Sequence, residues 1–445
     1  MRLIIPILLI LRSKLHLIFL TYMHSSLLLK NVIIVSPYSD LNGQMADILI
    51  EEGKIVRIGE GVKAPEGARL FEEVGACVSI GWMDVGGQFC DPGFEHREDL
   101  GSAAQAAMAG GFTAVAPYPN TEPATDSKTG VLYIRNRTRN SLVDFYPIGA
   151  VSKGCEGKDI SEMLDMRQAG AVAFSDGKRS IQHAGLLLRA LQYVKIFDGL
   201  VIHYPNDKTI SGNGQMHEGL TSTSLGLTGI PSMAEELMIQ RDLQLLEYAE
   251  SRLHLANISS AHSVELVRRA KKKGLAVTAS VAVMNLAFDD LALRDFDSHF
   301  KVMPPLRAKT DLAALHKGLE DGTIDFISSN HVPIDSEGKN LEFPYAAFGA
   351  IGLETAYALS NTSMKKGLSH GALVEKWALN ARKILGLPIP ELVEGAVANL
   401  TIFNPEREWV VDEGALRSKS RNTPLMGMKL RGKVLGVVNN GKFKV

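Results

Sequence analysis

The chain has 445 residues, of which 45% are hydrophobic and 22% are charged, enough for one large domain and a small one. Lys and Arg total 48, and Asp and Glu total 49. This balance excludes a general attraction to nucleic acid or to an anionic membrane surface. The three cysteines form no CxxC pair, which excludes a disulfide framework, and we expect a cytoplasmic protein.

The first 22 residues are read separately from the rest. An apolar run, Leu3 to Leu11, follows Arg2 and resembles the core of a secretion signal. However, residues 12–14 interrupt it with polar side chains, and no small-residue cleavage site follows. The stretch is also too broken for a membrane span, which needs about 20 apolar residues. We interpret residues 1–22 as an extension ahead of a start near Met23; an export or membrane signal is the alternative.

Short β-rich runs joined by turn residues lie at both ends of the remaining chain. They predict a small β-sandwich domain made of two parts, residues 23–79 and 386–445, which meet in space. The runs are residues 27–35, 46–50, 54–58, 398–403 and 433–438, and Asn439-Asn440-Gly441 is a hairpin turn.

Between residues 80 and 385, short apolar strands alternate with helices of about 10 to 15 residues. Alternation over about 300 residues predicts a parallel sheet, and at this length a (β/α)8 TIM barrel fits best. A doubly wound open sheet is the alternative, although no GxGxxG motif follows the first strand. The predicted strands include residues 113–116, 171–174, 199–202, 275–278 and 324–327, and the predicted helices include residues 232–251, 263–272 and 312–319.

Polar residues follow several of these strands. In barrels of this kind the chemistry lies at the carboxyl ends of the strands. Each such residue alone is an ordinary loop residue, but their joint placement predicts a functional site at one end of the barrel. The residues are Asp84 and those after it, Asn120, Asp176, His203, Asn257, Met303, and Asn330 with His331.

Residues 84–99, DVGGQFCDPGFEHRED, resemble the dihydroorotase segment DxHxHxREPGxExKED, most clearly in their second half. With the further motifs, the chain is identified as a member of the dihydroorotase family, in the amidohydrolase superfamily, over nearly all of residues 27–445. The resemblance implies the conversion of dihydroorotate and water to N-carbamoyl-aspartate in pyrimidine biosynthesis. The further motifs are YPNTEP (118–123), GCEGK (154–158), AFSD (173–176), MHEG (216–219), LGLTGIP (225–231), MPPLR (303–307), GLET (352–355) and SRNTP (420–424).

The resemblance also implies two zinc ions that activate a bridging hydroxide, with a final Asp that shuttles the proton. Each metal needs several nitrogen or oxygen ligands to lower the pKa of bound water. Glycine offers no ligand atom, and an Asn amide cannot accept and return a proton near neutrality. We therefore expect no firmly bound cofactor, and at most one weakly held zinc. The lost ligand positions are Gly86, Gln88, Asn257 and Asn330 (the last also the general-base position), and the retained ones are Asp176 and His203.

The substrate side is depleted as well. The family's carboxylate-binding Arg is replaced by Cys90, so the bidentate clamp on the substrate is missing. Met303 stands where the family has Asn, and Ile334 where it has a second His. Asn120 remains as a substrate-binding residue. We expect His254, His262 and His331 to be structural.

Three functions follow from this pattern. The first is a non-catalytic dihydroorotase-like protein, a homo-oligomer that supports assembly of the aspartate transcarbamoylase catalytic subunit, with no nucleic-acid or membrane partner. The second is an active cyclic-amide hydrolase with an atypical or single-metal site at Asp176 and His203. The third is a small-molecule sensor that uses the emptied pocket. The changes are confined to strand ends while the core pattern is intact, which favours the first.

Overall fold

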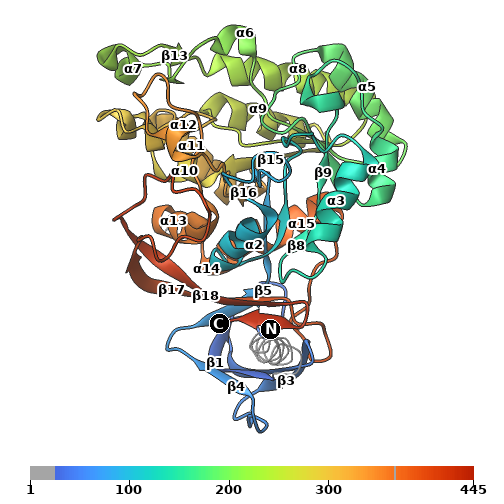
Figure 1. Cartoon of the computed structure of the whole chain (residues 1–445), viewed down its shortest axis with the longest axis vertical. Helices are drawn as coiled ribbons and strands as arrows, with labels where there is room; N and C mark the ends of the chain where they lie inside the picture. Colours follow the sequence, from blue (N-terminus) through green and yellow to red (C-terminus); the bar gives the residue numbers. More distant parts are fainter. Residues whose placement is uncertain (1–25, 365–366) are drawn as a thin grey trace, which may run out of the picture.

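The computed structural model describes residues 26–364 and 367–445. It consists of a β/α barrel and a smaller β domain, to which the first and the last described strands both belong (Figure 1). The predicted TIM barrel with an attached β domain is confirmed. The interpretation of residues 1–22 lies outside the described residues, and the predicted domain boundaries stay predictions.

The β domain is built from both ends of the chain in one continuous sheet. Its order is β19-β18-β17-β5-β1-β2-β3, and β4 pairs with β1. β5 and β17 join the two ends, because Ile80 pairs with Leu400 in antiparallel register. The strands are β1 (Leu27–Ile34), β2 (Met45–Glu51), β3 (Lys54–Gly59), β4 (Arg69–Glu72), β5 (Cys77–Ile80), β17 (Leu400–Val410), β18 (Lys429–Asn439) and β19 (Lys442–Lys444).

The barrel is a ring of parallel strands in two hydrogen-bonded groups, β6-β7-β8 and β9-β10-β11-β14-β15-β16. β8 and β9 together occupy one strand position of the ring, because β8 pairs with β7 and β9 pairs with β10. Tyr146-Pro147 separates the two pieces. The ring is joined at its ends by the main-chain bond from Gln88 N–H to His331 O, 2.9 Å. The strands are β6 (Trp82–Val85), β7 (Phe112–Ala116), β8 (Asp144–Phe145), β9 (Ile148–Gly149), β10 (Ala173–Phe174), β11 (Val201–His203), β14 (Leu253–Leu255), β15 (Val277–Ala282) and β16 (Phe326–Ser328).

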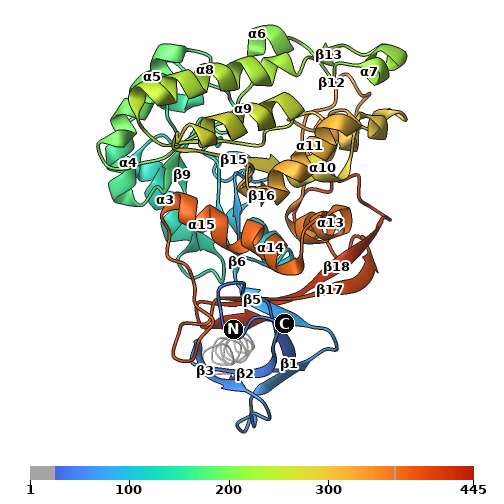
Figure 2. The same ribbon diagram turned by 180° about the vertical axis from the view of Figure 1, so that it is seen from behind.

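Helices surround these strands, and Figure 2 shows α5 (Ala184–Lys195), α8 (Met233–Ala249) and α9 (Ala261–Lys272) along the outside of the barrel. Local sequence sets their ends. For example, the Ser260 hydroxyl caps α9 by accepting from Ser263 N–H, 3.0 Å, and basic residues fill its last turn, where they suit the helix dipole. The predicted helices at 232–251, 263–272 and 312–319 correspond to α8, α9 and α11.

The bounds of the remaining elements complete the fold. The helices are α2 (Leu100–Ala109), α3 (Lys128–Thr138), α4 (Met163–Ala169), α5 (Ala184–Lys195), α6 (Lys208–Ser211), α7 (Leu220–Leu225), α8 (Met233–Ala249), α9 (Ala261–Lys272), α10 (Val283–Ala287), α11 (Lys309–Glu320), α12 (Ser336–Lys339), α13 (Ala356–Ser363), α14 (His370–Val374) and α15 (Asn380–Leu385). The shorter elements are β12 (Met216–His217), β13 (Gly229–Ile230), the 3-10 turns η1 (Lys153–Cys155), η2 (Asp290–Leu293), η3 (Ser298–Phe300) and η4 (Leu353–Thr355), and the π-helical η5 (Glu375–Leu379).

A cluster of buried rings joins the barrel to the β domain, and we call it the aromatic frame. Trp82 lies at its centre, fully buried, with its indole N–H donating to Ser79 Oγ at 2.9 Å. Its ring centroid lies 4.6 Å from that of Tyr357 and 5.2 Å from that of Phe403. Close ring packing of this kind rigidly fixes the start of β6. The frame consists of Trp82, Phe112, Tyr357, Trp377 and Phe403.

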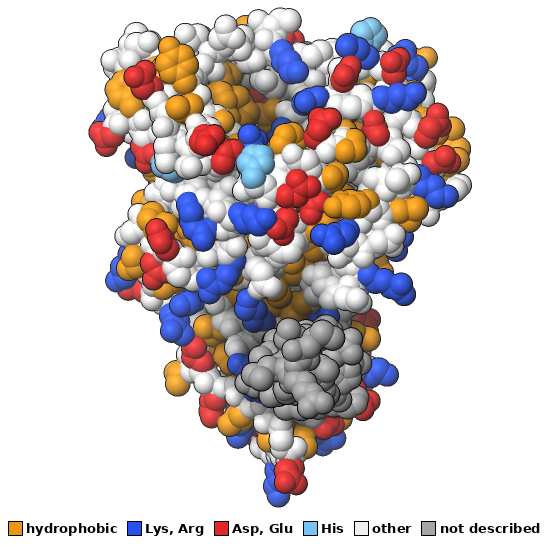
Figure 3. Space-filling model, viewed as in Figure 1, with side chains coloured by type: hydrophobic (Ala, Val, Ile, Leu, Met, Phe, Trp, Pro, Cys, Tyr) orange, Lys and Arg blue, Asp and Glu red, His pale blue; other side chains and the backbone are white. Residues whose placement is uncertain are grey.

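The surface agrees with the balanced composition. Acidic and basic side chains are interspersed over the face shown in Figure 3. In the described part of the chain, the helices are too short or too polar to cross a membrane.

Candidate functional site

The predicted site residues gather after the carboxyl ends of the barrel strands, and we call this region the barrel mouth. Its residues come from the ends of β6, β7, β10, β11, β14 and β16 and from the segment before Pro304. It consists of Asp84, Gly86, Gln88, Tyr118, Asn120, Asp176, Lys178, His203, Asn257, Met303 and Asn330.

At the end of β6, an aromatic ring fills the space that a side chain at Gly86 would need. Gly86 has φ +88°, and a Cβ atom built there would lie 2.7 Å from Cζ of Tyr118. Tyr118 is buried after β7, the strand next to β6. A histidine side chain at position 86 is therefore incompatible with this position of the Tyr118 ring. The neighbouring Gln88 is anchored through its main-chain N–H.

Across the mouth, two replaced positions are bonded to each other. Asn257 Nδ2 donates to Asn330 Oδ1 at 3.2 Å, and Asn257 Oδ1 accepts from Ser328 Oγ at 2.6 Å. Asn330 Nδ2 donates to the main-chain oxygen of Met303 at 3.2 Å. Both asparagines have positive φ, 55° and 51°, a conformation that Asn adopts more readily than most residues. The amides therefore satisfy one another, and the structure brings Asn257, Met303 and Asn330 together.

A cation that the sequence did not single out completes this network. The ammonium group of Lys178, after β10, donates to Asn330 Oδ1 and lies 5.7 Å from the centre of the Tyr118 ring. An ammonium group only donates, so it fixes the orientation of the Asn330 amide. Burial lowers the pKa of Lys178 to about 8, and the charge of Asp84 opposes that shift.

Asp84 is the buried carboxylate whose charge acts on Lys178. Burial raises its pKa, while hydrogen bonds from Ser329 hold it down. Ser329 N–H donates to Oδ1 at 2.7 Å and Ser329 Oγ donates to Oδ2 at 2.6 Å. Both oxygens accept these hydrogen bonds, which favour the ionised form but do not outweigh burial. Burial therefore acts on both groups: it raises the pKa of Asp84 and lowers the pKa of Lys178.

His203, one of the two retained ligand positions, has both ring nitrogens engaged. Its Nε2 accepts from Ile181 N–H at 2.9 Å, so Nδ1 carries the proton and donates to Asp242 Oδ2 at 2.5 Å. Arg241 binds the other oxygen of Asp242. The lone pair that a metal would need is used by a backbone amide. Asp242, on α8, is distant in sequence from His203 and was not predicted.

The second retained position, Asp176, also faces protein donors. Its carboxylate accepts from Ser152 N–H at 2.9 Å and from Ser152 Oγ at 2.5 Å. Asn120 supports the same loop, since its Nδ2 donates to Asp176 O at 2.9 Å and its Oδ1 accepts from Lys178 N–H at 2.8 Å. The predicted substrate-binding side chain of Asn120 is thus bonded to main chain through both its nitrogen and its oxygen. Asp176 and His203 have different hydrogen-bond partners.

Cys90, another replaced substrate position, is buried, as are His254 and His331. His262, also predicted to be structural, is exposed on α9. Burial raises the pKa of the Cys90 thiol to about 12, so this side chain offers neither charge nor clamp. His254 Nδ1 contacts Thr278 Oγ1 at 2.8 Å and its ring stacks on Phe326 at 4.7 Å, while burial lowers its pKa to about 3. His331 Nδ1 accepts from Gly352 N–H at 3.1 Å.

These contacts test whether a zinc site fits the mouth. Within residues 26–364 and 367–445, no three His, Cys, Asp or Glu side chains are placed to hold an ion together. Position 86 is closed by Tyr118, the His203 lone pair is occupied, and the Lys178 ammonium group lies on Asn330. A fixed cation repels a divalent metal. The residues present do not fit the two-zinc centre.

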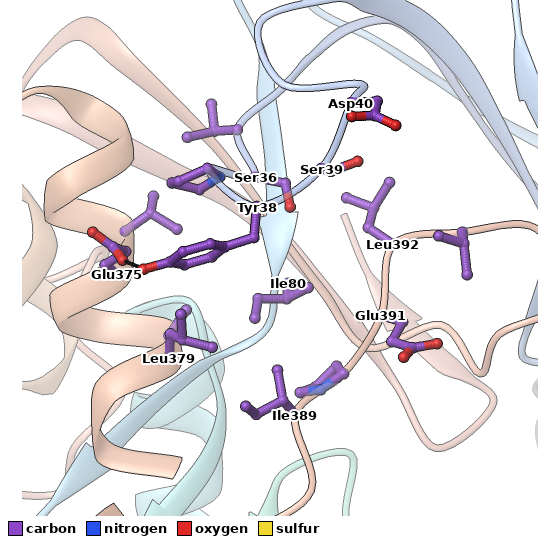
Figure 4. A pocket seen from close by; sticks show the side chains of 16 residues that line it. Ser36, Tyr38, Ser39, Asp40, Ile80, Glu375, Leu379, Ile389, Glu391 and Leu392 are labelled. Carbon is purple, nitrogen blue, oxygen red and sulfur yellow. Dashed lines mark hydrogen bonds between the residues drawn. The ribbon is translucent and has the colours of Figure 1, made fainter. Parts of the chain in front are cut away.

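A separate pocket of about 460 Å³ lies between the β domain and the barrel helices. Figure 4 shows Tyr38 extending across it to Glu375, to which its hydroxyl donates. Ile80, Ile389 and Leu392 supply apolar walls. No barrel-mouth residue lines this pocket.

The fold defines the class of the protein. The amidohydrolase family model matches residues 209–444, more than half of the chain. An L-hydantoinase (dihydropyrimidinase) from Arthrobacter aurescens has a TM-score of 0.82 with 25% identity, over 95% of this chain and 96% of that one. A D-hydantoinase has a TM-score of 0.79 with 22% identity, over 94% and 95%, and supports the fold alone.

Curated relatives narrow the class. The dihydroorotase-like family model matches residues 77–263. A dihydroorotase of Syntrophus aciditrophicus (strain SB) is 42% identical over 420 residues, covering 94% of this chain and 98% of the relative. A dihydroorotase of Acetivibrio thermocellus is 42% identical over 422 residues, covering 94% and 99%. The chain belongs to the dihydroorotase family, as the sequence motifs predicted.

Proposed function

We propose that this dihydroorotase-family protein is non-catalytic and takes part in pyrimidine biosynthesis through its surface. One observation carries the proposal: at four of the family's six ligand positions, namely Asp176, His203, Asn257 and Asn330, the side chain is hydrogen-bonded within the protein. His203 Nε2 and both carboxylate oxygens of Asp176 accept hydrogen bonds from protein donors, and Asn257 is bonded to Asn330. A hydrolytic centre instead needs free ligands and an open coordination position.

The acid/base side supports the same proposal. Asn330 stands where the family has its proton-shuttling Asp, and its Oδ1 accepts from Lys178 and Asn257. A carboxamide has no pKa near neutrality and cannot carry a proton between water and a ring nitrogen. The Cys90 thiol replaces the guanidinium that would hold a substrate carboxylate.

As partner we propose the catalytic subunit of aspartate transcarbamoylase, bound by a homo-oligomer of this chain in the cytoplasm. The support is the family resemblance, together with a barrel whose core and aromatic frame remain closely packed. A packed shell with a depleted mouth leaves the surface as the functional part.

Two measurements test the non-catalytic proposal. Protein purified without chelators should contain substoichiometric zinc, and it should neither open dihydroorotate nor close N-carbamoyl-aspartate. The matched control is the Syntrophus aciditrophicus dihydroorotase, 42% identical, purified and assayed in parallel. Stoichiometric zinc after dialysis, or turnover by the unaltered chain, would overturn the proposal.

Co-expression with the aspartate transcarbamoylase catalytic subunit from the same source tests the partner. We expect one large particle on size-exclusion chromatography and weaker carbamoyl transfer when this chain is withheld. Separate elution at micromolar concentration, with equal transferase activity alone, would contradict the partner while leaving the non-catalytic proposal in place.

A second candidate function is an active cyclic-amide hydrolase with an atypical site. The observation in its favour is the 42% identity to relatives called dihydroorotase over nearly their full length. Sequence identity over the whole chain reflects mainly the residues that build the fold, whereas hydrolysis depends on a few residues of the barrel mouth. Turnover abolished by His203→Asn, together with zinc that the same change removes, would select this candidate.

A further inference from the structure

Another pocket, of about 640 Å³, lies between α2, the end of α3 and the hairpin of β18 and β19, and we call it the basic pocket. Figure 1 shows α2 above β18, and Lys444 Nζ of β19 donates to Gln105 Oε1 of α2 at 2.8 Å. No barrel-mouth residue lines the basic pocket. Its volume is in the range of small-molecule sites.

The loop after α3 holds the hairpin from the other side. Asn440 Nδ2 donates to the main-chain oxygen of Ser141 at 3.2 Å. Lys442 Nζ donates to the main-chain oxygen of Asn140. Hydrogen bonds thus join the hairpin both to α2 and to the loop after α3, so the walls of the basic pocket are already assembled.

The charges in this pocket are of one sign. Among the described residues, its lining includes four basic side chains and no Asp or Glu. The Arg137 guanidinium, at the exposed end of α3, has no hydrogen bond or ion pair within residues 26–364 and 367–445. A cleft lined by charges of one sign concentrates ligands of the opposite sign. The four basic residues are Arg69, Arg137, Lys442 and Lys444.

Apolar side chains lie beside these charges. Leu100 and Met108 of α2 and Leu142 after α3 are buried and line the pocket, and Phe443 of β19 is half-buried. The Arg69 guanidinium carbon lies 5.7 Å from the centre of the Phe443 ring. An inorganic ion would use the charges alone, whereas this lining also offers contact to an apolar or aromatic group.

We propose that the basic pocket is a binding site for a small phosphorylated molecule with an aromatic body, of the class of nucleoside monophosphates. A phosphate monoester carries about −1.5 to −2 charges at pH 7, so it balances several cations where a carboxylate balances one. The unpaired Arg137 guanidinium has the planar geometry that binds two phosphate oxygens at once. The proposal does not depend on the non-catalytic function, because the two sites share no residue.

Isothermal titration calorimetry of the unaltered chain tests the site. The probes are AMP and UMP, and the comparison ligands are inorganic phosphate, adenosine and uridine. We expect one site per chain, at which at least one nucleotide binds about tenfold or more tightly than inorganic phosphate and than its own nucleoside. The affinity should fall as NaCl is raised from about 50 to about 500 mM, because salt screens the charges.

Variants locate the binding in this pocket. Arg137→Glu reverses a charge at an exposed position, and it should weaken nucleotide binding by about tenfold or more. Arg137→Ala combined with Lys442→Ala should do the same. Lys128→Ala, at an exposed lysine that begins α3, is the matched control and should bind as the unaltered chain does. Thermal unfolding checks that each variant is folded, and Arg137→Glu decides if the double variant is not.

Three results would overturn the proposal. They are no binding of either nucleotide, binding no tighter than that of inorganic phosphate or of the nucleoside, and unchanged affinity in Arg137→Glu. Zinc content and dihydroorotate turnover are measured separately on the unaltered chain. A failure here therefore removes the basic pocket as a ligand site and leaves the proposed function in place, whereas zinc-dependent turnover removes the proposed function alone.

Discussion

The two ends of strand β6 differ in how their side chains are used. At its start, Trp82 is fully buried in the aromatic frame, with ring neighbours 4.6 and 5.2 Å away. At its end, Gly86 stands at a family ligand position and the Tyr118 ring fills the space beside it. The strand is thus closely packed where it enters the barrel, and where it leaves it is followed by a glycine, which has no ligand atom.

The difference teaches what each region contributes. Frame residues stabilise the fold through buried area, which no rearrangement of neighbours replaces. Mouth residues are polar, and once ligands are lost the remaining groups can bond to each other, as Asn257 and Asn330 do. Changes in the mouth are therefore tolerated by the fold.

The largest effect is expected in the frame. Trp82→Ala should lower the free energy of unfolding by about 3–5 kcal/mol, because it leaves a cavity among Phe112, Tyr357 and Phe403. Urea denaturation measures it. Trp409→Ala, at a half-buried tryptophan of β17, is the control and should cost clearly less. Equal losses at the two tryptophans would break the distinction between frame and surface.

The second-largest loss of stability is expected at the ion pair of Asp242 with Arg241, beneath the mouth. Asp242→Ala removes the partner of His203 Nδ1 and of Arg241, so about 3 kcal/mol of unfolding free energy should be lost. Glu247→Ala, exposed on the same helix α8, should change stability by less than about 0.5 kcal/mol. If zinc restored the stability of the variant or raised that of the unaltered chain, His203 would be acting as a ligand instead.

The pH dependence sharpens the comparison at His254. The unfolded histidine binds a proton near pH 6.5, whereas burial lowers the folded pKa to about 3. The unfolded state therefore binds more protons between these values, and stability falls as the pH falls. From pH 7 to pH 5 the loss from this residue should be about 2 kcal/mol. His254→Gln should show a shallower decline in urea denaturation, and parallel curves would contradict a neutral buried histidine.

The smallest effect is expected at Asn330. Asn330→Asp restores the family's carboxylate, but we expect no dihydroorotate turnover, because metals and base act as one unit. Its stability should change by less than about 1 kcal/mol, since Lys178 faces the new carboxylate while the bond to Met303 O is lost. A spectrophotometric ring-opening assay and thermal unfolding measure both. A clear rate from this single change would show that the mouth is nearly competent.

The sequence predicted the fold well because barrel strands are short, apolar and regularly spaced. Residues 113–116 and 324–327 correspond to β7 and β16 within a residue or two. The β domain was also predicted, and the run 27–35 corresponds to β1, which has an irregularity that accommodates Asn31 at φ +53°. Periodicity reports such local features directly.

The mouth was predicted as a set of positions but not as a network. Lys178 follows Asp176 by two residues, and nothing in its own neighbourhood indicates that it would cross to Asn330. Likewise, Asp242 becomes the partner of His203 only because α8 packs beside β11. The one available signal was that Gly86 and Tyr118 follow neighbouring strands, so that an aromatic ring stands opposite a missing side chain.

The pairing of β5 with β17 also governs the order of events during synthesis. Ile80 must wait for Leu400 to leave the ribosome before the two strands can bond. Until then the edge of β5 is unpaired, and such edges recruit other chains. Closing so long a stretch of chain is slow because non-local contacts carry an entropic penalty. The β domain is therefore the last part of the molecule to be completed. We expect the need for chaperones to be set by the β5–β17 junction rather than by the barrel.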